Sequence, residues 1–409
     1  MNSTAAPRIR ARDVVWFALG VLLPVPWLVA QAFEGFGLPF EMIALLAGSA
    51  ILGSAFMLSW ACEVAERDIP QSLALLVLAL VGVLPEYAID LHFAWMAGKD
   101  PVYAGYAVAN MTGANRLLIG FGWTAVVLLA CWKGQTRELT LHPRQRLELR
   151  FLVWATLYSF LIPLSGSISL WDAVVLLGLF VAYLRAALKG EYEEVELVGP
   201  ARLIDEEFQD VGRRAWAFGL FVFAAGSIFL SAEPFAESLV HLGQNYDVDE
   251  FLLVQWVAPL ASESPEFVVA LLFAWRLRGS VGIGALVSSK VNQWTLLVGA
   301  IPICYALSLG APHGLPLDAR QVQELLLTSA QSLLAAVMLS DLSFSRKEAL
   351  ALAALFVGQL IFSSSAARWA FTGLYLLASV GLLTLGPKTQ REAFLQLLLP
   401  QGMRRSAPP

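Results

Sequence analysis

The stretch PEYAIDLHFAW (Pro85–Trp95) returns later in the chain as PEFVVALLFAW (Pro265–Trp275). Six of the eleven positions are identical, and each copy lies inside a long apolar run. A proline–glutamate pair is a poor choice for packing there, because proline removes a backbone donor and a buried charge is costly. The repeated pair therefore indicates a functional element, and its placement decides the fold.

The composition of the chain is that of a helical membrane protein. Of its 409 residues, 58% are hydrophobic and 14% are charged, whereas soluble domains carry roughly 25% charged residues. Apolar runs of about 20 residues recur, which is the length that crosses a hydrocarbon core of ~30 Å. We predict an all-α polytopic membrane protein with twelve spans: 14–33, 40–62, 71–97, 103–132, 150–165, 168–187, 214–240, 249–275, 281–309, 322–341, 347–364 and 367–386.

The distribution of positive charge predicts the orientation of these spans. With the N-terminus inside, 22 of the 27 Lys and Arg residues fall in cytoplasmic segments and three in outer loops. This asymmetry is what the positive-inside rule requires, so we expect both termini in the cytoplasm. The other two, Arg116 and Lys290, lie within spans. The first span is expected to be an uncleaved helix, with a signal peptide as the alternative.

The chain divides near its middle. We expect a first half over 1–188, an acidic cytoplasmic linker over 189–213 and a second half over 214–409. The first repeat motif occupies 80–120 and the second 258–300.

The two proline–glutamate helices fall in the third and eighth predicted spans and therefore cross the membrane in opposite directions. Inverted repeats are typical of secondary transporters, with the site near the bilayer midplane. The span after each repeat helix also changes character halfway, in GYAVANMTGANRLLIG (Gly105–Gly120) and GIGALVSSKVNQWTLLVG (Gly282–Gly299). Small residues there permit close helix packing, but packing does not explain the asparagines.

These paired motifs resemble those of the calcium/cation antiporters, a superfamily that includes sodium/calcium exchangers. Each repeat of that family carries a proline–glutamate motif on one helix and a Gly-Asn-x-x-Gly-Ser-Asn-like motif on the next. The resemblance implies two inverted repeats forming a five-plus-five core, with one additional helix at each end. It also implies a bacterial inner membrane, given the short linker and tail.

The resemblance further implies a set of cation ligands. Glu86 and Glu266 correspond to the two glutamates that ligate Ca²⁺ in the family. Further positions match its hydroxyl and amide ligands: Ser262, Ser289, Asn110 and Asn115.

Several positions depart from the family pattern, and some of them resemble sodium ligands. The residues found instead are Gly82, Val83, Leu118, Glu263, Ala285, Lys290 and Gln293. In particular, Ala285 and Lys290 replace the two motif asparagines of the second repeat. Sodium coupling is correspondingly less favoured.

Helical spacing extends the acidic set. Asp90 follows Glu86 by four residues and Glu263 precedes Glu266 by three, so each pair shares a helix face. Arg116 and Lys290 carry the opposite charge, so the four carboxylates and the two cations together have a formal charge of −2. We expect Lys290 to act as a tethered counter-ion in the space of a bound cation, and the site to exchange one Ca²⁺ for two protons or for other monovalent cations. Arg116 either pairs with Asp90 or bridges helices.

The function predicted from these features is secondary active antiport of Ca²⁺ against H⁺ or Na⁺ by alternating access. Exchange of another small cation, or ion sensing without transport, is the alternative. We expect no cofactor, no nucleic-acid partner and no enzymatic activity, with the lipid bilayer and small inorganic cations as the partners. The chain has no glycine-rich nucleotide loop that would indicate ATP-driven transport.

Overall fold

The computed structural model of the protein describes residues 11–33, 37–65, 84–189, 197, 199–208 and 210–399. The first part of the predicted third span, with Gly82 and Val83, lies outside the described residues, as do residues 190–196, 198 and 209 of the acidic linker.

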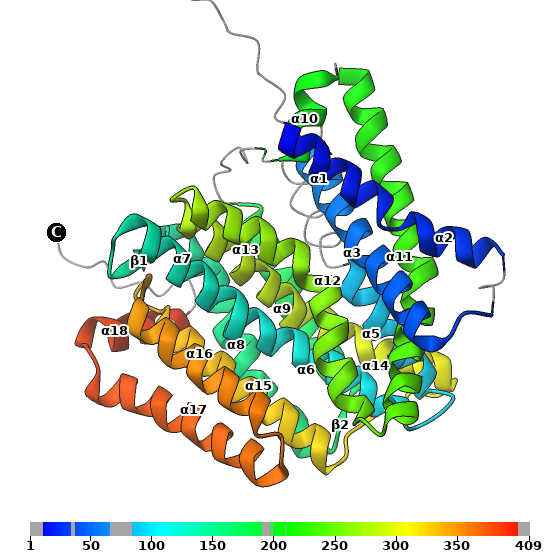
Figure 1. Ribbon diagram of the computed structural model, residues 1–409. Helices are drawn as coiled ribbons and strands as arrows, with labels where there is room; N and C mark the ends of the chain where they lie inside the picture. Colours follow the sequence, from blue (N-terminus) through cyan, green and yellow to red (C-terminus); the bar gives the residue numbers. More distant parts are fainter. Residues whose placement is uncertain are drawn as a thin grey trace, which may run out of the picture. The chain divides into compact units, whose positions relative to one another are not determined.

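The described chain is almost entirely helical (Figure 1). Proline and glycine set several helix ends: Pro24, which has no backbone N–H, separates α1 from α2. Residues 118–123 and 293–297 are wider π-helical segments, η2 and η5. The α-helices are α1 (Ala11–Leu22), α2 (Val25–Ala32), α3 (Phe40–Ala65), α5 (Leu84–Ala97), α6 (Tyr103–Leu117), α7 (Thr124–Gly134), α8 (Arg146–Ser159), α9 (Leu170–Ala187), α10 (Pro200–Glu207), α11 (Asp210–Tyr246), α12 (Glu250–Trp275), α13 (Gly279–Asn292), α14 (Val298–Leu309), α15 (Ala319–Met338), α16 (Arg346–Ile361), α17 (Ser365–Leu385) and α18 (Lys388–Leu398).

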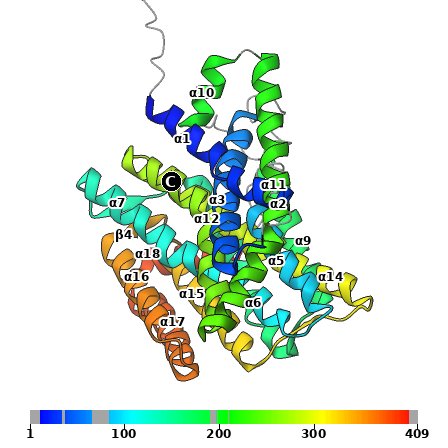
Figure 2. The ribbon, with the colours of Figure 1, turned by 45° about the vertical axis from the view of Figure 1, so that its right-hand side comes forward.

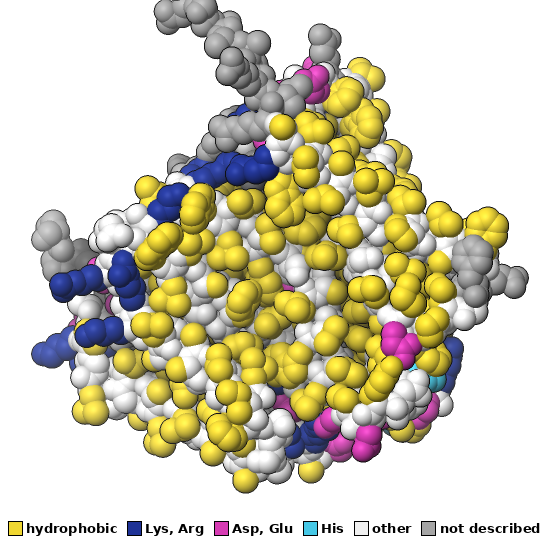
Figure 3. All heavy atoms as spheres, in the orientation of Figure 1, with side chains coloured by type: hydrophobic (Ala, Val, Ile, Leu, Met, Phe, Trp, Pro, Cys, Tyr) yellow, Lys and Arg dark blue, Asp and Glu magenta, His cyan; other side chains and the backbone are white. Residues whose placement is uncertain are grey.

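The protein is an integral membrane protein. In the described part of the chain, nine helical segments are long and apolar enough to cross a membrane, among them α6 through α7 and α13 through α14 as continuous rods. The remaining three predicted spans coincide with α5, α15 and α16, and the number of twelve spans remains a prediction. Figure 3 shows a largely apolar outer surface, with Lys and Arg side chains gathered where β1 and α18 lie.

The helices form two compact units. Unit 1 contains the described parts of 1–92 and 187–253, and unit 2 contains those of 93–186 and 254–409. Each unit therefore draws on both halves of the sequence, and each is described by itself below.

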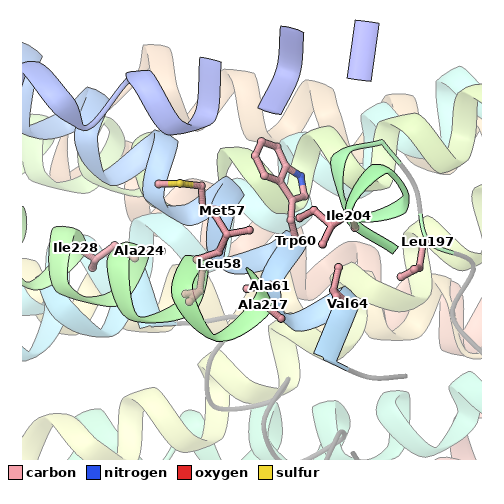
Figure 4. Close-up of a cluster of buried hydrophobic side chains, with 12 residues drawn as sticks. Met57, Leu58, Trp60, Ala61, Val64, Leu197, Ile204, Ala217, Ala224 and Ile228 are labelled. Atoms are coloured by element: carbon pink, nitrogen blue, oxygen red, sulfur yellow. The ribbon is translucent and has the colours of Figure 1, made fainter. Parts of the chain in front are cut away.

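Unit 1 is built on the long contact between α3 and α11, the first of which is rich in small residues. A Cβ on Gly48 would meet the ring of Phe235 at 2.8 Å, so glycine is what lets these helices approach so closely. Their apolar side chains form a cluster with those of α10 (Figure 4). The cluster contains Met57, Leu58, Trp60, Ala61, Val64, Leu197, Ala201, Ile204, Ala217, Leu220, Ala224 and Ile228.

Unit 2 is centred on α15, which packs against α6, α8 and α17 (Figures 1 and 2). Its start is fixed by a capping box in which Asp318 and Gln321 satisfy each other's backbone N–H groups. Because α15 lies inside the unit, it buries polar as well as apolar side chains, including Glu324 and Gln331.

Two short antiparallel strand pairs join the loops of unit 2, a small addition to the predicted all-α fold. Strand β1 (Glu138–Thr140) pairs with β4 (Ser343–Ser345), and β2 (Ser167–Ile168) pairs with β3 (Leu315–Pro316). The first pair joins two loops predicted to be cytoplasmic, and the second joins two predicted to be outer. The pairings therefore agree with the predicted alternation of the spans in this unit.

Candidate functional site

The first repeat helix, α5, places its two carboxylates on one buried face. Glu86 and Asp90 are one helical turn apart, and both are buried. Two residues further along, the Nε2 atom of His92 lies 3.0 Å from Oε1 of Glu237 in α11. This part of the site belongs to unit 1.

The second repeat helix, α12, remains continuous through Pro259 and Pro265. It buries Glu263, whose Oε1 accepts a hydrogen bond of 2.7 Å from Nε2 of Gln293, and it leaves Glu266 half-buried. The hydroxyl of buried Ser262 donates to carbonyls of its own helix, at 3.3 and 3.4 Å. Its oxygen lone pairs therefore remain available as acceptors.

The asparagine helix α6 meets the second motif helix α13 through Asn115. The Nζ atom of Lys290 lies 2.6 Å from Oδ1 and 3.3 Å from the backbone oxygen of Asn115. Both side chains are buried, as is that of Asn110, whereas Ser289 is half-buried. The contact joins residues that occupy equivalent positions in the two motifs, each the fifth after Asn110 or Ala285.

The two motif helices share a second local feature. Segment η2 begins three residues after Asn115, and η5 begins three residues after Lys290. A π-helical turn inserts one residue into the helical repeat and often marks a functional site. The matching positions give the two repeats a common geometry that goes beyond the sequence match.

Arg116 belongs to a network of buried side chains that connects four helices. Its Nη2 lies 2.6 Å from Oε2 of Glu324, and both side chains are almost completely buried. Gln255 of α12 donates to the same carboxylate at 3.1 Å, and Arg368 of α17 lies 3.6 Å from its other oxygen. The guanidinium is also 5.0 Å from the ring centre of Trp256. Arg116 thus bridges helices, which was one of the two alternatives.

Sequence reasoning did not identify Glu324. It lies two residues inside the predicted tenth span, where an acidic residue is usually taken for a helix-end residue. An acidic residue within a predicted span was a signal, but an ambiguous one, because the sequence does not show which buried cation contacts Glu324.

The structure brings Asn115 together with Lys290, and Glu263 together with Gln293, all in unit 2. Glu86 and Asp90 lie in unit 1 and are described with it. Within the described ranges, no three His, Cys, Asp or Glu side chains converge as in a protein-only metal cluster. Hydroxyl, amide and backbone oxygens are common ligands of hard cations.

A helical membrane protein that buries carboxylates, amides and an ammonium group within its spans has the features of a transporter, because charge at that depth is expensive and is kept for function. The sequence model of the sodium/calcium exchanger protein family matches residues 39–189 and 216–365. The chain belongs to this family. Each matched segment contains one proline–glutamate motif and the polar motif that follows it.

Solved structures agree with this assignment. The protein is 44% identical to the H⁺/Ca²⁺ exchanger CAX, with a TM-score of 0.89 over 95% of this chain and 98% of that one. It shares its fold with YfkE, with 14% identity and a TM-score of 0.60 over 89% of this chain and 99% of that one. It also shares its fold with the sodium-calcium exchanger NCX_Mj, with 17% identity and a TM-score of 0.51 over 85% of this chain and 98% of that one. Among curated proteins, no sequence matches the chain.

Proposed function

We propose that the protein is a secondary active antiporter that moves Ca²⁺ across the membrane in exchange for protons. The observation that carries this proposal is the 44% identity to an H⁺/Ca²⁺ exchanger over nearly the whole chain. Glu86 and Glu266, one from each repeat, act as the charged ligands of Ca²⁺. Carboxylate oxygens are the ligands that Ca²⁺ prefers, and the same groups can carry protons on the return step.

The neighbouring polar groups complete this coordination in our proposal. Ca²⁺ takes six to eight oxygen ligands, more than two glutamates supply. The additional oxygens come from the buried side chains of Ser262, Glu263, Asp90 and Asn110 and from the half-buried hydroxyl of Ser289.

Protons are the favoured counter-ion because the chain lacks several neutral oxygen ligands of its family. Ala285 and Leu118 carry no side-chain oxygen, and Lys290 adds a positive charge. Each of these changes weakens a site for a monovalent metal ion, whereas the carboxylates that remain can still bind protons.

Alternating access follows from the repeat architecture that we propose. Spans two to eleven form two five-helix repeats of opposite orientation, and the first and twelfth spans are additions. Both termini lie in the cytoplasm of a bacterial cell, at its inner membrane. The matching π segments and the strand pairs between loops of equal predicted sidedness support this arrangement.

The test is uptake of radiolabelled Ca²⁺ into proteoliposomes with an outward proton gradient, an outward sodium gradient or neither. We expect uptake driven by protons, and we expect Glu266→Gln and Glu86→Gln to reduce it to background, because each removes a charged ligand and keeps the side-chain shape. Glu392→Gln, on the exposed face of α18, is the matched control and should transport normally.

The outcomes separate the alternatives. Uptake without any gradient dependence would contradict antiport. Ca²⁺ binding by the purified protein without uptake would favour an ion sensor, and proton-coupled uptake of a different cation would retain the antiporter and change its substrate.

A further inference from the structure

Two spans of unit 2 end, on the predicted cytoplasmic side, in a pair of exposed tryptophans. Trp132 belongs to α7 and Trp275 is the last residue of α12, and their ring centres lie 6.3 Å apart. Their exposed fractions of 60% and 51% are large for tryptophan. The Nζ atom of Lys133 lies 3.8 Å from the ring centre of Trp275, which is a cation–π contact. The two helix ends therefore present one aromatic and cationic surface where their apolar spans stop.

The turn that follows α12 adds an apolar side chain to this surface. Leu277 has a φ of +62°, a backbone conformation that residues other than glycine rarely adopt, and its exposed fraction is 61%. A Cβ on Gly134, two residues after Trp132, would lie 3.6 Å from Cδ2 of Leu277, so the leucine lies against the end of α7. A strained backbone that exposes a leucine is unfavourable in water. It is compatible with a position against lipid, because lipid tails are as apolar as the leucine side chain.

The formal charge around this surface is positive. Residues 132–139 and 275–280 contain four basic side chains and one acidic side chain, a net charge of +3: Lys133, Arg137, Arg276, Arg278 and Glu138. The two segments are packed together, because a Cβ on Gly279 would meet that of Ala130 at 2.6 Å and the side chain of Leu139 at 3.2 Å. The positive charge agrees with the Lys and Arg side chains that gather near β1 in Figure 3. It attracts anions to this point of the membrane boundary.

We propose that this surface, formed by Trp132, Lys133, Trp275 and Leu277, is a binding site for an anionic phospholipid of the cytoplasmic leaflet. The ammonium of Lys133 donates to the phosphate, the two indole rings lie at the level of the headgroup, and Leu277 contacts an acyl chain. Tryptophan and lysine take this depth because each has an apolar body and a polar end. A soluble anion would use the charge and leave the exposed rings and the leucine in water, so the apolar groups favour a lipid. The bound lipid touches both α7 and α12, and the inference holds whichever cation the protein transports.

The test is the melting temperature of the detergent-purified protein with increasing dioleoylphosphatidylglycerol, because a ligand of the folded state raises it. Dioleoylphosphatidylcholine, with the same acyl chains and no net charge, and inorganic phosphate, without chains, are the comparison ligands. We expect the wild-type protein to be stabilised by the anionic lipid and by neither of the others. Lys133→Gln should require about fivefold more of the anionic lipid for half of the shift, the effect of one basic side chain at an anionic surface. Lys388→Gln, which removes an exposed lysine of α18 from the same predicted side, is the matched control and should respond like wild type.

A second variant keeps the test valid if Lys133→Gln does not fold. Leu277→Gly removes the apolar side chain and is compatible with the φ of +62°, because glycine adopts this conformation without a steric penalty. Without added lipid it should therefore fold like wild type. It should also require more of the anionic lipid for half of the shift, because the acyl chain loses its contact with the leucine.

Four results would overturn the inference. Equal stabilisation by the phosphatidylcholine would show that the charge is not recognised, and equal stabilisation by phosphate alone would mark a site for small anions. A loss of lipid affinity in Lys388→Gln as large as that in Lys133→Gln would reduce the effect to the general charge of this face. Folded Lys133→Gln and Leu277→Gly proteins that respond to the anionic lipid like wild type would show that the lipid binds elsewhere.

Discussion

Arg116 and Lys290 are both buried within predicted spans, and the contacts described for them differ. Arg116 contacts a carboxylate, a glutamine side chain shares that carboxylate, and four helices meet around it. Lys290 contacts an amide next to the candidate ligands. A buried ion pair with satisfied hydrogen bonds holds helices in register. At the scale of single residues, we therefore assign Arg116 to the scaffold.

The ion pair of Arg116 makes a prediction about stability. Glu324→Gln should destabilise the protein by about 3 kcal/mol, because it leaves a buried guanidinium without its counter-charge. The double variant Arg116→Met with Glu324→Gln should be more stable than Glu324→Gln alone, since the buried guanidinium of Arg116 is then no longer left without its counter-charge. Melting temperatures of the purified proteins check both statements, with Glu392→Gln as the reference for an exposed carboxylate. Equal destabilisation by the single and double variants would show that the charge pair is not what matters.

At the scale of helices, the contact between α6 and α12 joins the polar motif of one repeat to the glutamate helix of the other. Gly113 of α6 lies directly against the backbone carbonyl of Gln255, and a Cβ at this position would overlap that oxygen. The backbone oxygen cannot swing away as a side chain would, so the absence of a side chain at Gly113 sets the distance between the two helices.

Gly113→Ala should therefore force α6 and α12 apart and lower the free energy of unfolding by about 1–3 kcal/mol, the usual destabilisation caused by overpacking. Gly178→Ala is the matched control, because a Cβ on Gly178 in α9 meets no atom within 4 Å. It should leave stability unchanged or raise it slightly, since alanine is the better helix former. Thermal unfolding in detergent measures both, and a Gly113→Ala protein as stable as the control would contradict the assigned contact.

Sequence periodicity predicted the positions of the helices well, and it predicted their local geometry less well. Runs of apolar residues located α3, α11 and α12, because length and composition are sufficient to define a span. The π segments η2 and η5 were not predicted, since they depend on how the helix is packed rather than on composition. The partner of Arg116 was missed for a related reason: a contact between distant helices leaves no periodic signal in one sequence.

The paired motif had more predictive power than any single residue. It indicated the family, which the comparisons confirm, and it named Asn115 and Lys290 separately without indicating that they touch. Their contact follows from an approach of α6 to α13 that three-dimensional packing sets. The assignment of Glu86, Glu266 and the other ligands to Ca²⁺ remains a prediction.

At the scale of the whole molecule, contacts between loops carry information on the topology. Besides the two strand pairs, the backbone N–H of His142 donates to Ser280, and the hydroxyl of Ser308 donates to the carbonyl of Trp95. His142 and Ser280 belong to loops predicted to be cytoplasmic, and Trp95 and Ser308 to span ends predicted to face outward. No contact among these crosses from one predicted side to the other.

The predicted orientation can be tested with single cysteines placed in these loops. In a background with the native Cys62, Cys131 and Cys304 replaced, Gln135→Cys and His313→Cys each introduce a thiol at a position outside the helices. A membrane-impermeant maleimide applied to intact cells should label His313→Cys and leave Gln135→Cys unlabelled until the membrane is permeabilised, because basic loops are retained in the cytoplasm. The reverse labelling pattern would show that the protein has the opposite orientation in the membrane, with the two loops still on opposite sides. Labelling of both thiols in intact cells would contradict the prediction that these two loops lie on opposite sides.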